Sequence, residues 1–324
     1  MSKFVRAVLA GAALAAACTA AVGQTYPEAG KPIRFVIGFP AGSTIDNVSR
    51  ILLDDIRTRT GALLVIENKP GALGTIGLDA VTKAPADGYT LMPSSSATHS
   101  SGPFLSKAAQ KIDPLAGFSH VARVVRFDIV VVGSPGQGHT KASDLITAAK
   151  AKPNTMAYGY GSGTGQVAGA SFSRAAGIDV LGVSYKGQPP ALTDLIGGQV
   201  SYVAADLGAV LPLVRASKLS PLVLASSKRS TILPDVPTAR ELGLTGLDLT
   251  GWIGVAGPAQ MPAPVVEWWM SQLTTSMSST QVQDKLRTMG MEPDLLAGEK
   301  FQQFVRAQVD IWGKQIRAAG IQAE

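Results

Sequence analysis

The sequence predicts a globular α/β protein, and three observations support this class. Strand-like and helix-like segments alternate along the chain, which is typical of α/β layers rather than of separate all-α and all-β parts. The 324 residues are 46% hydrophobic and 16% charged, so the chain can bury substantial cores and is expected to form about two domains. Turns rich in glycine and hydroxyl side chains follow several strands, where open α/β sheets bind ligands.

The first strand-turn-helix unit is the most informative segment. Apolar and other residues alternate from Ile33 to Phe39 as in a mostly buried strand, and residues 40–42 stop it. Ser43 or Thr44 can cap the following helix, whose unpaired N–H groups would hold a carboxylate or phosphate. A Gly42 that only permits a tight turn would explain the pattern equally well. The apolar stripe expected to face the sheet is Ile45, Val48, Ile51, Leu52 and Ile56.

Two further strands are expected in this part of the chain. Residues 63–67 predict a strand and residues 76–83 a helix, and residues 87–92 form a turn that enters the next strand. That strand is expected to end in the hydroxyl-rich segment of residues 93–101. The segment lies where a ligand loop should lie, but a polar surface loop would have the same composition.

The second half of the chain repeats the alternation. Residues 129–132 predict a buried strand, Ser143 can cap a short helix, and residues 155–159 predict another strand. The glycine-rich turn of residues 160–166 would let a ligand approach the backbone, before a helix expected from Val167 to about Arg174. Neither G-x-G-x-x-G nor G-x-x-x-x-G-K-[ST] fits this turn, so a nucleotide site is not indicated.

The next elements lead to an acidic residue. A strand ending at residues 183–188 precedes a helix at residues 190–197. This helix is expected to turn its apolar residues inward, namely Leu192, Leu195 and Ile196. Residues 200–205 predict a strand that Asp206 closes. Asp206 could bind a cation, an amine or a hydroxyl of a ligand, or it could cap the next turn, and the sequence leaves both roles open.

The N-terminal residues predict a secretory signal peptide. Lys3 and Arg6 precede an apolar run from Ala7 to Ala17 that is too short to span a bilayer, and small residues suited to cleavage follow. We expect residues 1–23 to be removed and the mature protein to be periplasmic. Cys18, the only cysteine, lies in this segment and lacks the leucine that lipid-acceptor sites usually have three residues earlier. We therefore expect no lipid anchor, and a mature chain without disulfides.

Composition and motifs argue against several other functions. Without the leader the net charge falls from +6 to +4 and the basic residues are scattered, so no nucleic-acid partner is expected. The three histidines form no pair at metal-ligand spacing, and neither H-E-x-x-H nor G-x-S-x-G occurs. We expect no metal, no cofactor and no enzyme activity. His99 is expected to be structural, and a hydrolase that uses Ser96 or Ser162 is the alternative.

Motifs spread over the whole mature chain carry a family resemblance. They are Lys31-Pro32-Ile33-Arg34, Phe39-Pro40-Ala41-Gly42 with Asp46 and Arg50, Val65 to Ala72, Asp87-Gly88-Tyr89-Thr90-Leu91, Thr98-His99, Tyr185-Lys186-Gly187, Leu233 to Thr238 and Trp252 to Pro258. In this order they resemble the periplasmic solute receptors of tripartite tricarboxylate transporters, the Bug family.

The resemblance implies a two-lobe periplasmic binding protein fold of type II, with the ligand clamped in a cleft between the lobes. Residues 24–126 and 250–324 would form lobe one, and residues 127–249 would form lobe two. The C-terminal part would supply a strand at residues 252–256 and two helices with buried apolar stripes. These stripes are Val265, Val266, Trp269 and Leu273, and Phe301, Phe304, Val305, Trp312 and Ile316.

The resemblance also implies a set of ligand-binding residues. The turn of residues 39–46 would hold one carboxylate with its backbone N–H groups and hydroxyls, beside the loop of residues 94–99, and lobe two would close from above. The implied residues are Phe39, Ala41, Gly42, Ser43, Thr44, Asp46, Ser95, Ser96, Thr98, His99, Ser162, Gly163, Thr164, Tyr185 and Asp206. Closure would let the transporter recognise the loaded form.

The ligand itself is less well defined. Gln166 stands where many relatives have a histidine, and residues 101–118 differ from the usual loop. Lys186 is the only basic residue in the binding turns, so neutral donors are expected to hold the ligand. We expect the ligand to be a dicarboxylate, a class that includes aromatic acids such as terephthalate. The receptor is expected to be a monomer that delivers this ligand to integral-membrane transporter subunits. An amino acid with its amine on Asp206, or another organic acid, is the alternative.

Overall fold

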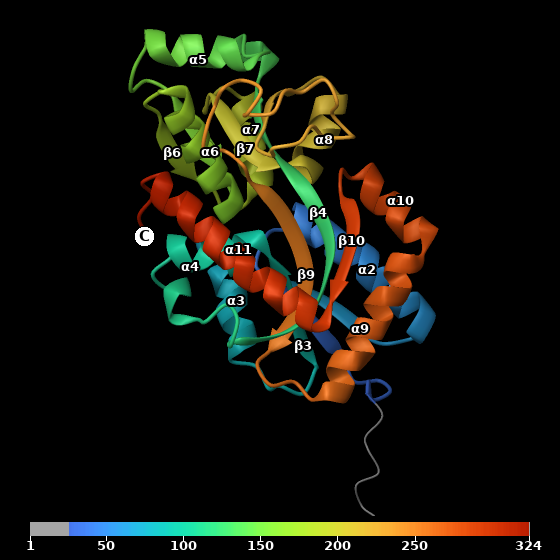
Figure 1. The fold of residues 1–324 in the computed structure, drawn as a ribbon. Coiled ribbons are helices and arrows are strands. Elements are labelled where there is room, and N and C mark those ends of the chain that lie inside the picture. The colour runs from blue at the N-terminus through green and yellow to red at the C-terminus, as the bar shows by residue number, and fades with distance from the viewer. Residues whose placement is uncertain (1–25, 324) are drawn as a thin grey trace, which may run out of the picture. The chain divides into compact units, whose positions relative to one another are not determined.

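A computed structural model describes residues 26–323 (Figure 1). The chain divides into a unit of residues 1–31 and a unit of residues 32–324. In the first unit, the N–H of Lys31 donates a hydrogen bond to the carbonyl of Glu28 over 3.1 Å. The predicted signal peptide and Cys18 lie outside the described residues. All helices and strands of the described part belong to the second unit.

Strands and helices alternate along the second unit. The first elements are β1 (Ile33–Ile37), α2 (Thr44–Thr60), β2 (Leu64–Asn68), η1 (Ala72–Gly74), α3 (Thr75–Thr82), β3 (Thr90–Ser95), η2 (Ser96–Ser101), α4 (Gly102–Leu105), η3 (Ala109–Lys111) and β4 (Phe118–Gly133). Next come η4 (Pro135–Gln137), α5 (Ala142–Ala151), β5 (Ala157–Tyr160), α6 (Gly163–Ala176), β6 (Leu181–Ser184), α7 (Gln188–Ile196), β7 (Tyr202–Asp206), α8 (Leu207–Arg215) and β8 (Ser220–Leu224). The last are β9 (Thr250–Pro258), α9 (Ala263–Ser278), α10 (Thr280–Thr288), β10 (Glu292–Ala297) and α11 (Gly298–Ala318).

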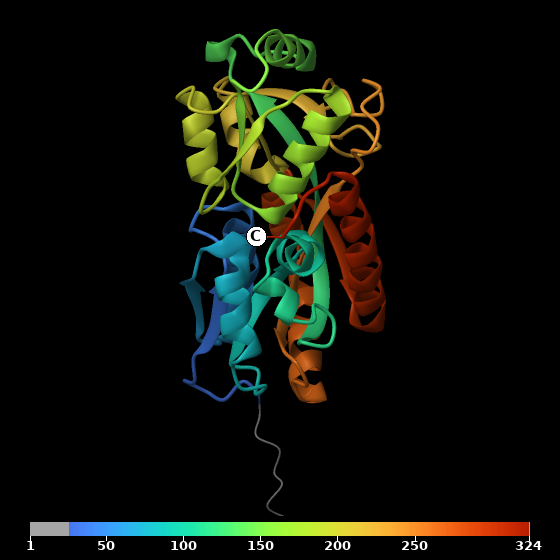
Figure 2. The same ribbon diagram turned by 90° about the vertical axis from the view of Figure 1, so that its left-hand side faces the viewer.

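The strands form one mixed sheet in the order β2-β1-β3-β9-β4-β7-β5-β6, and β8 and β10 also pair with β4. β1 runs parallel to β2 and β3, and β5 runs parallel to β6 and β7. The antiparallel strands β9 and β4 join these two parallel groups. Helices pack against the strands, with α11 lying along β4 (Figure 2). The predicted α/β class is confirmed.

β4 is a single strand of 16 residues that serves both groups (Figure 1). Its first part pairs with β9 as far as Asp128, which lies opposite Thr250. From Ile129, which lies opposite Asp206, it pairs with β7. The sequence predicted only residues 129–132 as strand, because most of the preceding residues are buried too and show no clear alternation.

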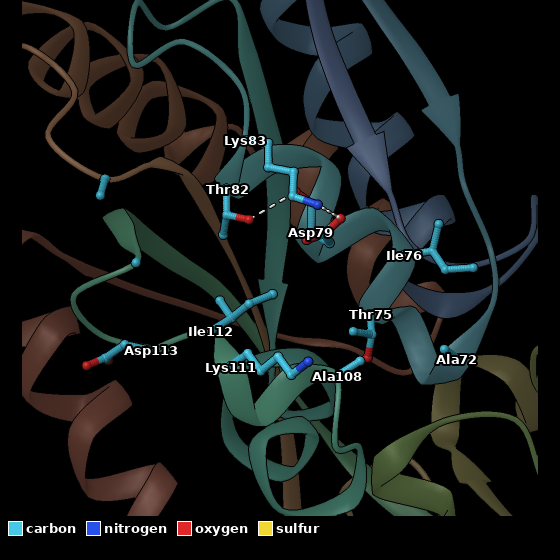
Figure 3. A pocket seen from close by; sticks show the side chains of 12 residues that line it. Ala72, Thr75, Ile76, Asp79, Thr82, Lys83, Ala108, Lys111, Ile112 and Asp113 are labelled. Carbon is cyan, nitrogen blue, oxygen red and sulfur yellow. Dashed lines mark hydrogen bonds and ion pairs between the residues drawn. The ribbon is translucent and has the colours of Figure 1, made fainter. Parts of the chain in front are cut away.

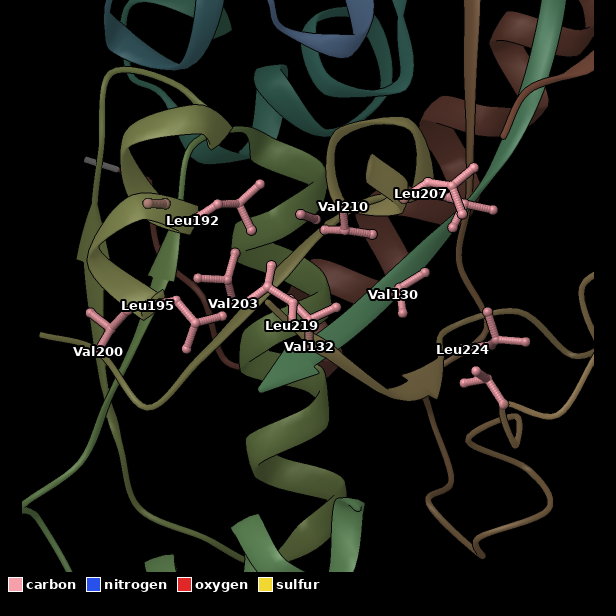
Figure 4. Close-up of a cluster of buried hydrophobic side chains, with 14 residues drawn as sticks. Val130, Val132, Leu192, Leu195, Val200, Val203, Leu207, Val210, Leu219 and Leu224 are labelled. Carbon is pink, nitrogen blue, oxygen red and sulfur yellow. The ribbon is translucent and has the colours of Figure 1, made fainter. Parts of the chain in front are cut away.

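An aliphatic core fixes α7 and α8 on the second group of strands (Figure 4). Leu192 and Leu195 are buried in it as predicted, whereas Ile196 is 41% exposed and the prediction for it was wrong. Burying a leucine or valine side chain stabilises a fold by roughly 1.5–3 kcal/mol relative to leaving it exposed. Burial of this cluster therefore holds the two helices against the strands. The buried members are Val130, Val132, Ala191, Leu192, Leu195, Val200, Val203, Ala205, Leu207, Val210, Leu211, Leu219, Leu224 and Val236.

The first residue of each helix is set by the residue that caps it, and composition alone did not predict it correctly in every case. Ser43 is the N-cap of α2, as predicted. Lys141, not Ser143, is the N-cap of α5, because Asp144 accepts from the N–H of Lys141 over 2.8 Å. α6 begins at Gly163 instead of Val167, since the hydroxyl of Ser162 caps it. The glycine-rich turn is therefore largely helical, and its glycines serve close approach of other segments.

The hydroxyl-rich segment after β3 is not a surface loop. β3 extends to Ser95, and residues 96–101 form a π-helical turn whose members are all buried. Ser101 closes the turn by donating from its hydroxyl to the carbonyl of Ala97 over 3.0 Å. The surface-loop alternative considered from composition is thus wrong, because the segment is buried and several of its hydroxyls bond within the protein.

The C-terminal aromatics form a core, as predicted. Trp252 of β9 packs against Phe301 of α11 at a ring-centroid distance of 5.6 Å, and Trp269 and Trp312 are also buried. Within the predicted stripes, Val266 and Phe304 are only half-buried, as is Ile51 of α2. These side chains lie at the margins of their helical faces.

Candidate functional site

The turn between β1 and α2 is fixed by the buried carboxylate of Asp46. Its Oδ2 accepts from the N–H of Gly42 over 2.9 Å and from Nε of Arg50 over 2.8 Å. Its Oδ1 accepts from Arg50 over 3.0 Å and from Nδ2 of Asn68 over 2.9 Å. Asn68 also donates to the carbonyl of Phe39 over 3.0 Å. Asp46 therefore holds the turn in place, with protein partners on both oxygens.

The surroundings of Asp46 favour its ionised form. Burial alone would raise the pKa of Asp46, but hydrogen bonds from Arg50, Asn68 and Gly42 outweigh it and hold the pKa below its ordinary value. The Asp46 side chain is 1% exposed and that of Arg50 is 48% exposed. Loss of a partner would leave a buried charge unpaired, which is costly in a protein interior.

The N-terminus of α2 offers two backbone donors. Ser43 accepts from the N–H of Asp46 over 3.4 Å, and its carbonyl accepts from the N–H of Asn47 over 2.9 Å. The N–H groups of Thr44 and Ile45, at the first two helical positions, have no acceptor within the helix. Together with the positive end of the helix dipole, these two groups are suited to a carboxylate.

The segment after β3 forms a hydrogen-bonded wall. The hydroxyl of Ser95 lies 3.0 Å from that of Thr98 and accepts from the Thr98 N–H over 3.3 Å. The hydroxyl of Ser96 accepts from the N–H of Trp252 over 3.3 Å. The Thr98 hydroxyl also lies 2.9 Å from Nδ1 of His99. The protein itself therefore uses much of the bonding capacity of these side chains.

His99 is buried among aromatic rings, a setting typical of a structural histidine. Its ring packs edge-on against Phe118 at 4.6 Å and lies 5.6 Å from the ring of His120, measured between centroids. Burial lowers the pKa of His99 well below its ordinary value, and the neighbouring His120 lowers it further. The polar partner of the ring is Thr98, so His99 is not paired with a serine nucleophile.

The N-terminus of α6 has the same organisation as that of α2. Ser162 accepts from the N–H of Gly165 over 3.1 Å, and the N–H groups of Gly163 and Thr164 have no acceptor within the helix. The side chain of Gln188 also donates to the Ser162 hydroxyl, over 3.2 Å. Since two donors occupy its oxygen, the hydroxyl hydrogen of Ser162 points to Oγ1 of Thr164, 2.8 Å away.

This chain of hydrogen bonds ends on Asp206. The Thr164 hydroxyl donates to Oδ1 of Asp206 over 3.3 Å, and the Asp206 N–H donates to Oε1 of Gln188 over 3.4 Å. Asp206 stands at the N-cap position of α8, yet its side chain makes no capping hydrogen bond. The capping role considered from the sequence is therefore wrong for the side chain, and the carboxylate is free to face other groups.

Asp206 is buried without a cationic partner among the described residues. Burial raises the pKa of Asp206 to about 6, and hydrogen bonds from Gln188, Thr164 and Thr44 offset part of the rise. The Thr44 hydroxyl makes no hydrogen bond of normal geometry, so its contact with Asp206 is loose. A carboxyl group in this state can accept from a donor on a ligand or share a proton with a ligand carboxylate.

Close contacts join the turns of the two strand groups. Ring atoms of Pro40 lie 2.7 Å from the position that a β carbon would occupy on Gly187. The hydroxyl oxygen of Ser101 and Cδ1 of Leu105 lie 2.5 and 3.0 Å from the corresponding position on Gly163. Glycine at these two positions lets the segments after β1 and β3 touch those after β5 and β6.

A pocket of about 370 Å³ opens beside these contacts. Residues 71–73 and 105–106 form one wall, and Tyr160 and residues 184–186 form the other. Small-molecule sites in proteins occupy roughly 300–1,000 Å³, so this pocket is large enough to hold a small organic acid. We name it the mouth pocket, because it lies where the two sets of turns meet.

A larger hollow of about 780 Å³ lies beside α3 and η3 (Figure 3). None of the predicted ligand residues lines it. Its lining includes Asp79 and Lys83, which pair with each other over 2.7 Å, and Figure 3 shows Lys111 across the hollow. We do not assign this hollow to the ligand, since the hydroxyl groups and free helix ends lie elsewhere.

Residues 48–321 match the model of the tripartite tricarboxylate transporter family receptor. The chain belongs to this family. It is a solute-binding receptor of the periplasmic Bug type and not an enzyme, in agreement with the expectation from its motifs. Within residues 26–323, no helix is long and apolar enough to cross a membrane, and no group of three or more acidic or histidine side chains is placed to hold a metal ion.

Relatives with similar sequences or structures agree with this assignment. Protein BugT of Bordetella pertussis is 29% identical over 299 residues, which cover 92% of this chain and 91% of BugT. The structure of R. palustris Rpa4515 with adipate has a TM-score of 0.87 and 28% identity, covering 92% of this chain and all of that one. The periplasmic binding protein BugD has a TM-score of 0.84 and 28% identity, covering 90% and 99%. The fold is therefore the two-lobe periplasmic binding protein fold.

The structure brings some predicted site residues together and separates others. Thr44, Ser162, Thr164 and Asp206 meet in one buried cluster, which we name the hydroxyl cluster. Ala41 and Gly42 are exposed, and Gly42 has a φ of 80° that explains the glycine as a turn residue. Tyr185 lies apart from the cluster in the mouth pocket, while Phe39 is buried under Gly74. The direct roles of these residues towards a ligand stay predictions.

Sequence reasoning missed several residues of the site. Gln188 links Ser162 to Asp206, and no local signal marks it as more than the first residue of a helix. The N–H of Ile45 could have been found once the cap was fixed at Ser43, because the free donors follow from that choice. Leu105 could not have been found, since its place beside Gly163 depends on the π-helical turn.

Proposed function

We propose that this receptor captures a small dicarboxylate between its two lobes and delivers it to the membrane subunits of a tripartite transporter. The observation that carries the proposal is the meeting of two helix N-termini, those of α2 and α6, at one buried cluster of hydroxyl groups. Each helix presents two backbone N–H groups without an intrahelical acceptor. Such neutral donors hold a carboxylate without a buried lysine or arginine.

The helix ends are brought together by side-chain contacts. Thr44 of α2 lies 3.3 Å, at Cγ2, from the position of a β carbon on Gly208 in α8, and it also faces Asp206. Thr164 of α6 bonds to the same Asp206. Three helices of 17, 14 and 9 residues thus begin around one point, and their dipoles favour an anion there.

The lobe boundaries are part of the proposal. We assign residues 24–126 and 250–324 to lobe one and residues 127–249 to lobe two. The change of partner along β4 supports this division, because pairing passes from β9 to β7 between Asp128 and Ile129. The register of Asp128 with Thr250 is consistent with a second crossover at the start of β9. Both connections are extended strands, which suit a hinge between lobes.

Relatives support a dicarboxylate as the ligand class. The R. palustris relative was solved with adipate, whose two carboxylates are separated by an aliphatic chain. In this chain we propose that α2 holds one carboxylate through the N–H groups of Thr44 and Ile45. The other end of the ligand would face lobe two. We further propose a periplasmic, monomeric receptor that its N-terminal signal peptide exports.

An amino acid or hydroxy acid is the second candidate, and Asp206 is the observation that favours it. A buried carboxylate without a cationic partner would be stabilised by a hydrogen bond from an ammonium or hydroxyl group of the ligand. The two candidates differ in their response to Asp206→Asn. The substitution should abolish amino-acid binding, whereas a dicarboxylate should still bind, because the amide can donate where the acid shared a proton.

A binding screen tests the proposed function. The protein would be unfolded, freed of bound solute and refolded, and its melting temperature measured with aliphatic and aromatic dicarboxylates, acidic amino acids and matched amides. Ligand at about 100 times its Kd should stabilise the fold by roughly 2.7 kcal/mol, a shift of a few degrees. Stabilisation by acids and not by their amides supports a carboxylate receptor. Stabilisation by neutral solutes alone would contradict it.

A further inference from the structure

The mouth pocket has a composition that the hydroxyl cluster lacks. Its walls carry two tyrosines and two leucines, one lysine and two serines: Tyr160, Tyr185, Leu73, Leu105, Lys186, Ser106 and Ser184. Aromatic and aliphatic faces of this kind suit a flat apolar body, and hydroxyl and ammonium groups suit its polar ends. The pocket thus offers a place for a part of the ligand other than the carboxylate at α2.

The phenol of Tyr185 is already engaged. Its hydroxyl donates to Oδ2 of Asp194 over 2.8 Å, and burial together with Asp194 raises the pKa of Tyr185 to about 12. The ring itself packs close to Gly159, where a β carbon would lie 3.2 Å from Cε2. Tyr185 therefore contributes a fixed ring to the pocket, and its hydroxyl is bonded to Asp194.

Lys186 is the cation at this pocket. It is exposed and forms no ion pair with any of residues 26–323. Asp194, eight residues further along the chain, accepts a hydrogen bond from Tyr185. The ammonium group is thus available to an anion that enters the pocket.

The opposite wall is a strained turn. Residues 71–74 all have positive φ, with values of 132°, 47°, 53° and 92°, and the middle two are Ala72 and Leu73 rather than glycines. A left-handed conformation costs a residue with a β carbon roughly 1–2 kcal/mol. The turn is held by interlocked backbone, since a β carbon on Gly38 would lie 2.6 Å from the carbonyl oxygen of Gly74. Strain kept at a pocket wall is typical of functional sites.

Some residues that line the pocket are neighbours of the turns that lead into α2 and α6. Leu105 lines the pocket and touches Gly163, the first residue of α6. Tyr160 precedes the Ser162 cap closely in sequence, and Gly187 after Lys186 touches Pro40 of the carboxylate-binding turn. An elongated ligand anchored at α2 could therefore extend into the mouth pocket.

We propose that the mouth pocket selects an aromatic dicarboxylate, with the ring between its tyrosine and leucine side chains and the second carboxylate on Lys186. This inference rests on the proposed function, because the first carboxylate is placed at α2. To the proposed function it adds the shape of the ligand and names Lys186 as the residue that binds the second carboxylate. The two acidic groups must lie at opposite ends of the ring for both contacts to form.

Two acids that differ by one group provide the test. Calorimetry would compare terephthalate with benzoate on the ligand-stripped protein and on the variants Lys186→Met and Lys150→Met. Lys150 is an exposed lysine of α5 outside the pocket and serves as the matched control. We expect terephthalate to bind at least about tenfold more tightly than benzoate, because its second carboxylate can form a charge-assisted hydrogen bond with Lys186. Lys186→Met should remove this gain and leave benzoate unchanged, whereas Lys150→Met should change neither.

Adipate and hexanoate, a second matched pair, separate failure of this inference from failure of the proposed function. If adipate binds but terephthalate gains nothing over benzoate, the receptor function stands and the aromatic selection is overturned. Equal losses for both aromatic acids in Lys186→Met would also overturn it. If no carboxylate binds to the unmodified protein, the proposed function fails and this inference falls with it.

Discussion

Thr164 donates a hydrogen bond over 3.3 Å to Asp206, a carboxyl group buried without a cation among the described residues. The bond is the last step of a chain that starts at Gln188 and the N-terminus of α6 and passes through Ser162. The Thr164 hydroxyl donates to the Asp206 carboxylate, while the Asp206 N–H donates to Gln188. Under the proposed division into lobes, Asp206 would be an acceptor of the second lobe that a ligand in the cleft has to satisfy.

Asp206 predicts a pH dependence of stability. Its folded pKa of about 6 lies above the ordinary 3.8, so its protonated form stabilises the fold at low pH and this contribution is lost as the pH rises through 6. Relative to Asp206→Asn, the unmodified protein should gain up to roughly 3 kcal/mol between pH 7.5 and 4. Urea unfolding of both proteins across this range measures the difference. A constant difference would show that the carboxyl is not desolvated.

Asp46 should contribute far more to stability than an exposed acid of the same helix. Asp46→Asn leaves Arg50, Asn68 and the Gly42 N–H with a poorer acceptor, and we expect a loss of roughly 3 kcal/mol. Asp54→Asn is the control, because the Asp54 side chain is 56% exposed and should cost at most about 0.5 kcal/mol. Denaturant midpoints provide both values. Similar losses at the two positions would contradict the anchoring role.

Closure predicts a variant that binds poorly without being less stable. In Gly187→Ala the new methyl group would meet the rigid ring of Pro40, which we assign to the other lobe, so the closed state should be disfavoured. We expect about a tenfold loss of ligand affinity with little change in the melting temperature of the ligand-free protein. Gly197→Ala, where the nearest atom would lie 3.5 Å away, should bind normally. Unchanged affinity in Gly187→Ala would mean that this contact does not form on binding.

The hydroxyl of Thr44 separates ligand binding from folding. It is buried without a normal hydrogen bond, so Thr44→Val should leave stability within about 1 kcal/mol. The same change should weaken carboxylate binding about tenfold, because the hydroxyl faces the proposed site. Thr193→Val, at an exposed position of α7, is the control. Calorimetry on both variants checks this, and a loss of stability without a loss of affinity would assign Thr44 to the fold alone.

Local signals in the sequence were enough for much of the fold. Ser43 was identifiable as a cap because the cap, the turn and the first apolar residue are adjacent. The same reasoning failed at α6, where glycine content suggested a loop and the Ser162 hydroxyl, through a single bond to Gly165, made a helix start. β4 was underestimated since its partners change along its length, and pairing with β9 depends on residues more than a hundred positions away.

Some parts of the candidate site were likewise predictable from the sequence, and others were not. The turn at Ser43 and Thr44 was predictable from local pattern and family resemblance. The link from Ser162 to Asp206 was not, because Gln188 reaches both only in the folded chain. The partners of Asp46 were not predictable for a similar reason, because Arg50 and Asn68 reach its carboxylate only in the folded chain.

The most direct test of the central claim is calorimetry of the ligand-stripped protein with a set of dicarboxylates, followed by mass spectrometry of the solute released on unfolding. We predict one molecule of dicarboxylate bound per chain and recovery of that acid unchanged. Chemical conversion of the acid, or a protein that binds no carboxylate but carries a solute without acidic groups from its native source, would contradict the account.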